Sequence, residues 1–276
     1  MPNIDRETVA GFGEEWAAFD QTSLPEREAA ALFGQYFDIF PCGVFGPAAQ
    51  GFDLGCGSGR WATRVAPQVG RLHCIDASSQ ALDVARRNLL HLGNCEFHHA
   101  SVESIPLDEA SMDFGYSLGV LHHVPDTRAG IESCARKLKV GAPLLLYLYY
   151  DFEGRPLWFR TIWRATNLLR LGISRLPRRI KRSVTSMIAA VVYLPLARLA
   201  KIADKLGLPT DHFPLAYYKS LSFYTMRTDA LDRFGTRLEK RFSRAQIEDM
   251  MREAGLERIV LSTTPPYWCA VGYRTG

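Results

Sequence analysis

The sequence predicts an α/β fold built on a doubly wound, mostly parallel sheet. A short apolar stretch at 51–54 runs into three glycines at alternate positions, Gly55, Gly57 and Gly59, and a helical pattern follows. Apolar stretches then alternate with helical patterns through residues 71–150. This alternation is typical of parallel strands joined by crossover helices.

The expected elements follow in chain order. Residues 71–78 predict a second strand that ends at Asp76, and Ser78 is the expected N-cap of a helix whose apolar stripe is Leu82, Ala85, Leu89 and Leu92. Residues 95–106, 111–126 and 138–150 predict a third strand, a fourth strand with its loop, and a long, wholly buried fifth strand. Because ligands of such sheets bind at the carboxyl ends of the strands, we expect the site there.

The glycine turn is typical of a nucleotide-cofactor cradle. Glycine is needed where the backbone takes positive φ or lies against a ligand, and a helix N-terminus follows the turn. The spacing differs from the G-x-G-x-x-G of hydride-transfer cofactors, and no Lys-Ser or Lys-Thr follows to hold a triphosphate. Asp76 lies about twenty residues further on, where a carboxylate can accept both ribose hydroxyl protons of an adenosine cofactor.

Residues 53–59 resemble the first motif, E/D-x-G-x-G-x-G, of class I S-adenosylmethionine (SAM) methyltransferases. The resemblance covers residues 45–150, and residues 241–263 and 267–274 look like the family's last helix, sixth strand and antiparallel seventh strand. Ile105-Pro106 and the sequence LHHVPD at 121–126 resemble the small-molecule group that includes quinone- and sterol-type enzymes. The resemblance implies an enzyme that uses SAM, on a seven-stranded sheet whose last strand is antiparallel.

The resemblance also implies which residues contact the cofactor. Asp53 is expected to organise the turn and to reach the methionine amino group, and Asp76 to hold the ribose. The family usually has an acid at the position of Ser101, so Ser101, the backbone of Val102 or Glu103 must contact the adenine instead. A carbonyl of Leu118 or Ser117 should meet the amino group. The expected cofactor-binding set is Asp53, Gly55, Cys56, Gly57, Gly59, Asp76, Ala77, Ser101, Val102, Glu103 and Leu118.

Candidates for catalysis follow the fourth and fifth strands. His122 and His123 are the best candidate bases, because an imidazole can take a hydroxyl proton near neutral pH. Tyr150 is the third catalytic candidate. The acceptor-binding candidates are Tyr149, Asp151, Tyr217, Tyr224 and Arg227.

No metal site is predicted. His73, His91, His98 and His99 are interpreted as structural, and His98 and His99 should point to opposite faces of their strand. The six cysteines are scattered without a C-x-x-C pair, which indicates reduced thiols.

Four segments are expected: an N-terminal helical cover (1–45), the SAM-binding core (46–152), a helical and aromatic lid inserted between strands five and six (153–240), and the end of the core sheet (241–276). Helices are expected at 12–20 and 24–41, with Trp16, Phe19 and Tyr36 as candidate cover for SAM. Within the lid, Pro156 should begin one helix, Pro195 should kink a longer one, and an aromatic segment covers 211–242.

The lid is strongly basic. Residues 155–205 hold twelve Lys or Arg and one acid, a net charge of +11, which leaves −7 for the rest of a chain whose net charge is +4. Either the arginines are a solvated outer face, or they meet an anionic substrate, a carrier-tethered chain or a membrane surface. The longer helix has an apolar stripe of Val184, Ile188, Val191, Leu199, Ile202 and Leu206.

The sequence favours a SAM-dependent methyltransferase that acts on a small or lipid-linked, anionic acceptor. A macromolecule methyltransferase, for RNA or a carrier protein, and a SAM-binding protein without activity stay open as alternatives. The basic run lacks the patterns of RNA-binding modules, which argues against nucleic acid. The N-terminus shows no secretion signal and no uncharged stretch reaches membrane-spanning length, so we expect a cytoplasmic protein, with peripheral membrane association left open.

Overall fold

The computed structural model describes residues 2–210 and 213–276 and divides the chain into two compact units. The core unit comprises Met1–Thr22, Ala30–Asp151 and Leu238–Gly276, and the helical unit comprises Ser23–Ala29 and Phe152–Arg237. Residues 211 and 212, the start of the expected aromatic segment, lie outside the described residues.

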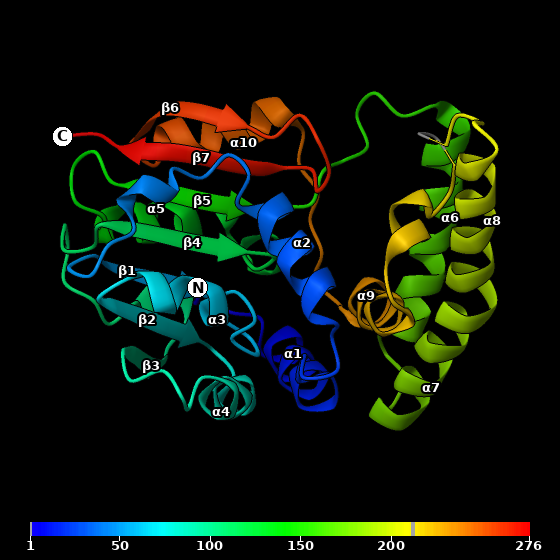
Figure 1. Ribbon diagram of the computed structural model, residues 1–276, viewed down its shortest axis with the longest axis horizontal. Coiled ribbons are helices and arrows are strands. Elements are labelled where there is room, and N and C mark those ends of the chain that lie inside the picture. Colours follow the sequence, from blue (N-terminus) through cyan, green and yellow to red (C-terminus); the bar gives the residue numbers. More distant parts are fainter. Residues whose placement is uncertain (1, 211–212) are drawn as a thin grey trace. The chain divides into compact units, whose positions relative to one another are not determined.

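The core unit is built on a seven-stranded sheet in the order β3-β2-β1-β4-β5-β7-β6 (Figure 1). Strands β1 to β5 pair in parallel, whereas β7 is antiparallel to both β5 and β6. The predicted fold class, with its antiparallel last strand, is therefore confirmed. The strands are β1 (Gln50–Leu54), β2 (Arg71–Asp76), β3 (Cys95–His99), β4 (Phe114–Leu118), β5 (Pro143–Tyr147), β6 (Leu256–Leu261) and β7 (Cys269–Arg274).

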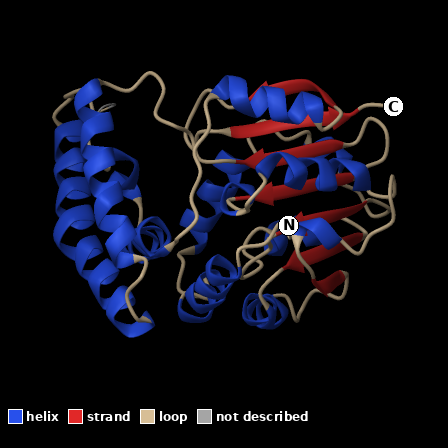
Figure 2. Ribbon diagram, turned by 180° about the vertical axis from the view of Figure 1, so that it is seen from behind, coloured by secondary structure: helices blue, strands red, loops and turns tan. Residues whose placement is uncertain are grey.

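Helices cover both faces of the sheet. Figure 2 shows α5 (Thr127–Lys137) and α10 (Arg244–Glu253) on the nearer face, where they bury one cluster with residues of β1, β2 and β5. As predicted, Ser78 caps α4 (Ser79–Asn88) by accepting a hydrogen bond from the Ala81 N–H. Shorter helical turns are α3 (Ala62–Val65), η1 (Cys42–Val44), η2 (Ala66–Gln68), η3 (Val102–Ser104) and η4 (Leu121–His123).

Two helices precede the sheet in the chain. Helix α1 (Arg6–Ala18) begins earlier than predicted, because Asp5 caps it by accepting from the Thr8 N–H. Helix α2 spans Glu26–Tyr36. A Cβ added at Gly13 of α1 would lie 2.3 Å from the Ser78 hydroxyl oxygen, so this glycine permits the close approach of α1 to the start of α4.

The helical unit contains α6 (Leu157–Ile173), α7 (Arg178–Ile188), α8 (Leu194–Lys205), a short turn η6 (Ala216–Ser220) and α9 (Phe223–Gly235). A π-helical segment, Ala189–Tyr193, joins α7 to α8 directly before Pro195. Such a wide turn accommodates a proline that cannot donate a backbone hydrogen bond. The unit's own core is formed by Ala189, Tyr193, Ala197, Met226, Ala230 and Phe234.

The predicted apolar stripe of the long helix is only partly packed within the helical unit. Ile188 packs against the unit's core, to which this helix contributes Ala189, Tyr193 and Ala197, while Val191, Leu199 and Ile202 are each more than half exposed. By length and composition alone, the segment Arg178–Lys205 could cross a membrane, and 28% of its most apolar window is buried. The sequence prediction required an uncharged stretch and therefore did not include it.

Arg170 departs from the interpretation of the basic run as one surface. Its guanidinium is buried and donates to the carbonyls of Thr236 and Arg237 and to the Asn167 side chain, at 2.8, 2.9 and 2.8 Å. Arg170 therefore holds the end of α9 and is not part of the solvent-exposed basic surface.

Candidate active site

The glycine turn after β1 has the backbone that its sequence requires. Gly55, Gly57 and Gly59 have φ of +76°, +56° and +78°, a region that residues with a Cβ rarely adopt. A Cβ at Gly57 would also lie 2.8 Å from the Trp16 indole. The turn is tied to β2 because the N–H groups of Gly55 and Cys56 donate to the Ile75 carbonyl at 2.7 and 3.1 Å.

Asp76 lies at the carboxyl end of β2 beside this turn. One carboxylate oxygen accepts from the Gly57 N–H at 2.9 Å, and the other accepts from the Ser78 N–H at 2.8 Å. A carboxylate has about four lone-pair sites, so capacity for two hydroxyl donors remains. Burial raises the pKa of Asp76, and the two backbone hydrogen bonds oppose the shift.

Asp53 is a buried carboxyl near the carboxyl end of β1. Its side chain is fully buried, and within the described part of the chain neither oxygen accepts a hydrogen bond. Burial raises its pKa to about 8, and the Tyr116 hydroxyl opposes only part of the shift. A buried carboxyl whose oxygens are not fully hydrogen-bonded fits a site that binds an ammonium group.

Two elements from the N-terminus cover this region of the core unit. Trp16 of α1 packs on Gly57, and the Arg60 guanidinium lies 5.8 Å from the Trp16 ring centre. Asn3 is buried and exchanges hydrogen bonds with the Asp126 backbone, and its N–H donates to Glu103. Trp16 was predicted as cover, whereas the role of Asn3 had no signal in the sequence. Phe19 is buried, and Tyr36 packs on Trp61 and Tyr147.

The other predicted cofactor-binding residues lie at η3 and at the ends of β2 and β4. The Ser101 and Ser104 hydroxyl oxygens are 3.1 Å apart, Val102 is buried, and the Ala77 carbonyl lies 3.0 Å from the His99 ring. Leu118 ends β4, and the neighbouring Ser117 hydroxyl donates to the Leu54 carbonyl at 3.0 Å. Their contacts with a cofactor stay predictions.

An aromatic cluster forms where β4 and β5 end. The His122 ring stacks on Tyr149 with ring centres 3.8 Å apart, and His123 lies 4.0 Å from His122. Burial lowers the pKa of His122 well below its usual value, and neighbouring His123 and Arg241 add to the shift. The His123 Nδ1 lies 2.6 Å from the Leu238 carbonyl oxygen, so a backbone acceptor holds this ring.

Arg241 belongs to this cluster although the sequence did not single it out. Its guanidinium lies 5.0 Å from the Tyr149 ring centre and pairs with Glu239 at 2.9 Å, and both side chains are largely buried. It also donates to the Tyr150 carbonyl at 3.2 Å. The pairing of Tyr150 with Phe242 places Arg241 in this cluster, and that pairing cannot be read from a single sequence.

The remaining predicted residues are divided between the units. Tyr150 packs against Tyr267 and Trp268, and the Asp151 N–H donates to Phe242 at the end of the core unit. The other three acceptor-binding candidates, Tyr217, Tyr224 and Arg227, belong to the helical unit. Their role in acceptor binding stays a prediction.

Comparison with known proteins identifies the core. Residues 52–141 match the family described as a methyltransferase domain. The ubiquinone biosynthesis O-methyltransferase of Nitrosomonas europaea is 35% identical over 140 residues, which cover 50% of this chain and 59% of the relative. That of Idiomarina loihiensis is 28% identical over 147 residues, with coverage of 51% and 60%. A SAM-dependent methyltransferase structure from Aquifex aeolicus superposes with a TM-score of 0.50 at 14% identity, covering 93% of this chain and 95% of that one.

The core of this chain is a class I SAM-dependent methyltransferase domain. Its cofactor is S-adenosylmethionine, and the buried Asp53 and the Gly57–Asp76 hydrogen bond fit that group. The chain spans 60% or less of the length of the curated relatives it matches. The likeness is therefore a likeness of the methyltransferase domain and not of whole proteins. The helical unit lies outside the matched domain.

Proposed function

We propose that this chain transfers the methyl group of SAM to a hydroxyl group of a small, lipid-linked acceptor. The methyltransferase domain supports the transfer, and relatives named as O-methyltransferases support a hydroxyl acceptor. The observation that carries the lipid-linked part is the exposed apolar surface of the helical unit, described below.

Bound SAM would supply an activated methyl group, so the chain has mainly to align the acceptor with it. In our proposal Asp76 binds the ribose, and Asp53 meets the methionine ammonium group. The rings of His122 and Tyr149 form an apolar, aromatic wall beside the acceptor. Asp53 and Asp76 are thus binding groups, and neither moves a proton of the acceptor.

His123 is the proposed base. A carbonyl oxygen can only accept, so the close contact with Leu238 requires that Nδ1 carries the hydrogen. In the neutral ring Nε2 then holds the lone pair, which can take the proton of an acceptor hydroxyl as the methyl bond forms. The Leu238 carbonyl fixes this tautomer.

The test of transfer is mass spectrometry of cell extracts incubated with the protein and isotope-labelled SAM. We expect an extractable apolar product that carries the label on oxygen. His123→Asn should lower its formation by about 10²-fold or more while SAM affinity stays unchanged. His91→Ala, which removes an exposed imidazole, is the matched control. Labelled macromolecules without a labelled small molecule would contradict the proposal.

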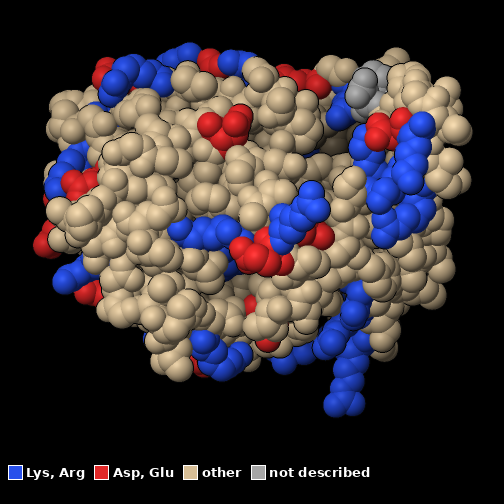
Figure 3. Space-filling model, in the orientation of Figure 1, with Lys and Arg blue, Asp and Glu red and all other residues tan. Residues whose placement is uncertain are grey.

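The helical unit concentrates the exposed apolar surface. Among the described residues, sixteen of the nineteen exposed large hydrophobic side chains belong to it, with Val191 at 64% and Leu206 at 71% exposed. Exposed arginines, including Arg178, Arg179 and Arg182, begin α7. Lys and Arg of this unit are visible at the right of Figure 3, with uncharged surface between the groups. Apolar and basic side chains together favour an anionic lipid surface.

Vesicle binding tests this part separately. We expect the full chain to bind vesicles that contain anionic lipid and to bind neutral vesicles weakly. Replacing Arg178, Arg179 and Arg182 by Gln should abolish the preference for anionic lipid, whereas replacing Val191, Leu199 and Ile202 by Ser should weaken binding to both. Equal and negligible binding by all three proteins would refute the membrane surface and leave a soluble acceptor.

A further inference from the structure

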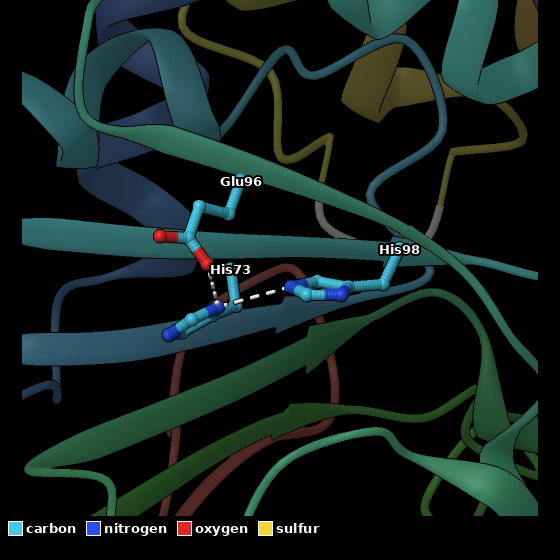
Figure 4. Close-up of side chains that lie close together, drawn as sticks. All are labelled: His73, Glu96 and His98. Carbon is cyan, nitrogen blue, oxygen red and sulfur yellow. Dashed lines mark hydrogen bonds and ion pairs between the residues drawn. The ribbon is translucent and has the colours of Figure 1, made fainter.

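Three metal-ligating side chains meet at the edge of the sheet, outside the methyltransferase site. The His73 Nδ1 lies 3.0 Å from the His98 Nε2 and 3.3 Å from a Glu96 carboxylate oxygen (Figure 4). The three ligand atoms lie within 4.8 Å of one another.

Strand register brings these residues together. His73 of β2 is the partner of Glu96 on β3, and Ile75 is the partner of His98. Glu96 and His98 are two residues apart on β3, so their side chains project on the same face as that of His73. None of the predicted cofactor-binding residues belongs to this cluster.

We propose that His73, Glu96 and His98 bind a divalent transition-metal ion of the Zn²⁺ type. Tetrahedral zinc with bonds of about 2.0–2.1 Å places its ligand atoms about 3.3 Å apart. The two measured separations of 3.0 and 3.3 Å from the His73 Nδ1 agree with that spacing. The third separation, between the His98 and Glu96 ligand atoms, is within 4.8 Å, so the two side chains would have to close on the ion by at most about 1.5 Å.

The donor set also fits such an ion. Two imidazoles and one carboxylate suit zinc, and three protein ligands leave the fourth position for water. The Arg71 guanidinium pairs with the other Glu96 oxygen at 3.1 Å, and this pairing leaves the first oxygen directed at His73.

The ion would join the outermost strand to its neighbour. Strand β3 is at one end of the sheet and pairs with β2 alone among the seven strands. An ion that binds only the folded chain raises the melting temperature in proportion to the logarithm of its concentration. The proposed ion would thus cross-link β3 to β2 at the edge of the sheet.

Calorimetric titration of the full chain with ZnCl₂, under reducing conditions, tests the proposal. We expect one ion per chain and a higher melting temperature in its presence. His98→Ala and the conservative Glu96→Gln should each weaken affinity by about tenfold or more, and His91→Ala, which removes an exposed imidazole outside the cluster, should not. Far-ultraviolet circular dichroism establishes that each variant is folded.

Cobalt substitution separates this site from the cysteines. Co²⁺ bound by nitrogen and oxygen gives only weak visible absorption, whereas cysteine ligation adds an intense thiolate-to-metal charge-transfer band. A charge-transfer band would overturn the proposal, and so would equal zinc affinity of the wild-type, His98→Ala and Glu96→Gln proteins. The absence of saturable zinc binding by the wild-type chain would overturn it as well.

Discussion

Replacing Asp53 with Asn should stabilise the SAM-free protein at neutral pH while weakening SAM binding. The carboxyl is buried, the Tyr116 hydroxyl offsets only part of the effect of burial, and the pKa of Asp53 rises from 3.8 to about 8 on folding. At pH 7 the unfolded chain carries this carboxyl ionised, about three pH units above its ordinary pKa. At ~1.4 kcal/mol per unit, folding must supply up to about 4 kcal/mol to protonate it.

The sign of the pH dependence follows from the raised pKa. The contribution of Asp53 to stability is fully present below pH 3.8 and is lost as pH rises through about 8. An amide at this position does not titrate. The free energy of unfolding of Asp53→Asn, relative to the wild type, should therefore rise by up to ~1.4 kcal/mol per pH unit between pH 5 and 7.5.

Urea unfolding of both SAM-free proteins across this pH range measures the effect, and the low-pH end serves as the internal control. Calorimetry adds a second readout, because an ammonium group that meets Asp53 would ionise it, and SAM binding would release a proton. A stability difference that is constant between pH 5 and 7.5 would refute the assignment of Asp53 as a buried, protonated carboxyl.

Three further predictions concern the cofactor site and the helical unit. Asp76→Ala should weaken SAM binding at least about tenfold by calorimetry, because each charge-assisted bond to the ribose is worth ~1.5–3 kcal/mol, and unchanged affinity would exclude ribose binding there. Arg170→Met should lower the free energy of unfolding by about 2–4 kcal/mol in chemical denaturation, whereas Arg175→Met, at an exposed position, should change it by less than about 0.5 kcal/mol. Equal effects would contradict the role of buried Arg170 in holding the end of α9. Replacing Phe152–Arg237 with a short linker should preserve SAM binding and abolish acceptor methylation, and retained turnover would refute the predicted lid.

The sequence was most informative where structure is local. The glycine turn, the Ser78 cap and Asp76 all lie within one strand-turn-helix unit and the strand that follows it, so spacing alone located them. Helix α1 was predicted to begin too late, at residue 12, because Gly11 interrupts the helical pattern while the Asp5 cap lies further upstream.

The sequence predicted less well which side chains are neighbours or buried, because these depend on strand register and on the rotation of each helix about its axis. His98 was correctly separated from His99, yet its neighbour is His73, on another strand and 25 residues away in the sequence. Composition identified the basic and apolar character of the insertion. It did not show that Arg170 is buried or that Val191 points away from the unit's core, because both depend on which side of a helix faces α9.

The acceptor side of the site is built from the two segments that flank the helical unit. The chain enters that unit after Asp151 and leaves it before Leu238, and the two ends pair through Tyr150 and Phe242. The returning segment supplies the Leu238 carbonyl beside His123 and places the Arg241 guanidinium near Tyr149. Leu238 is the first residue after the helical unit, so the backbone that leaves that unit supplies the carbonyl beside the proposed base.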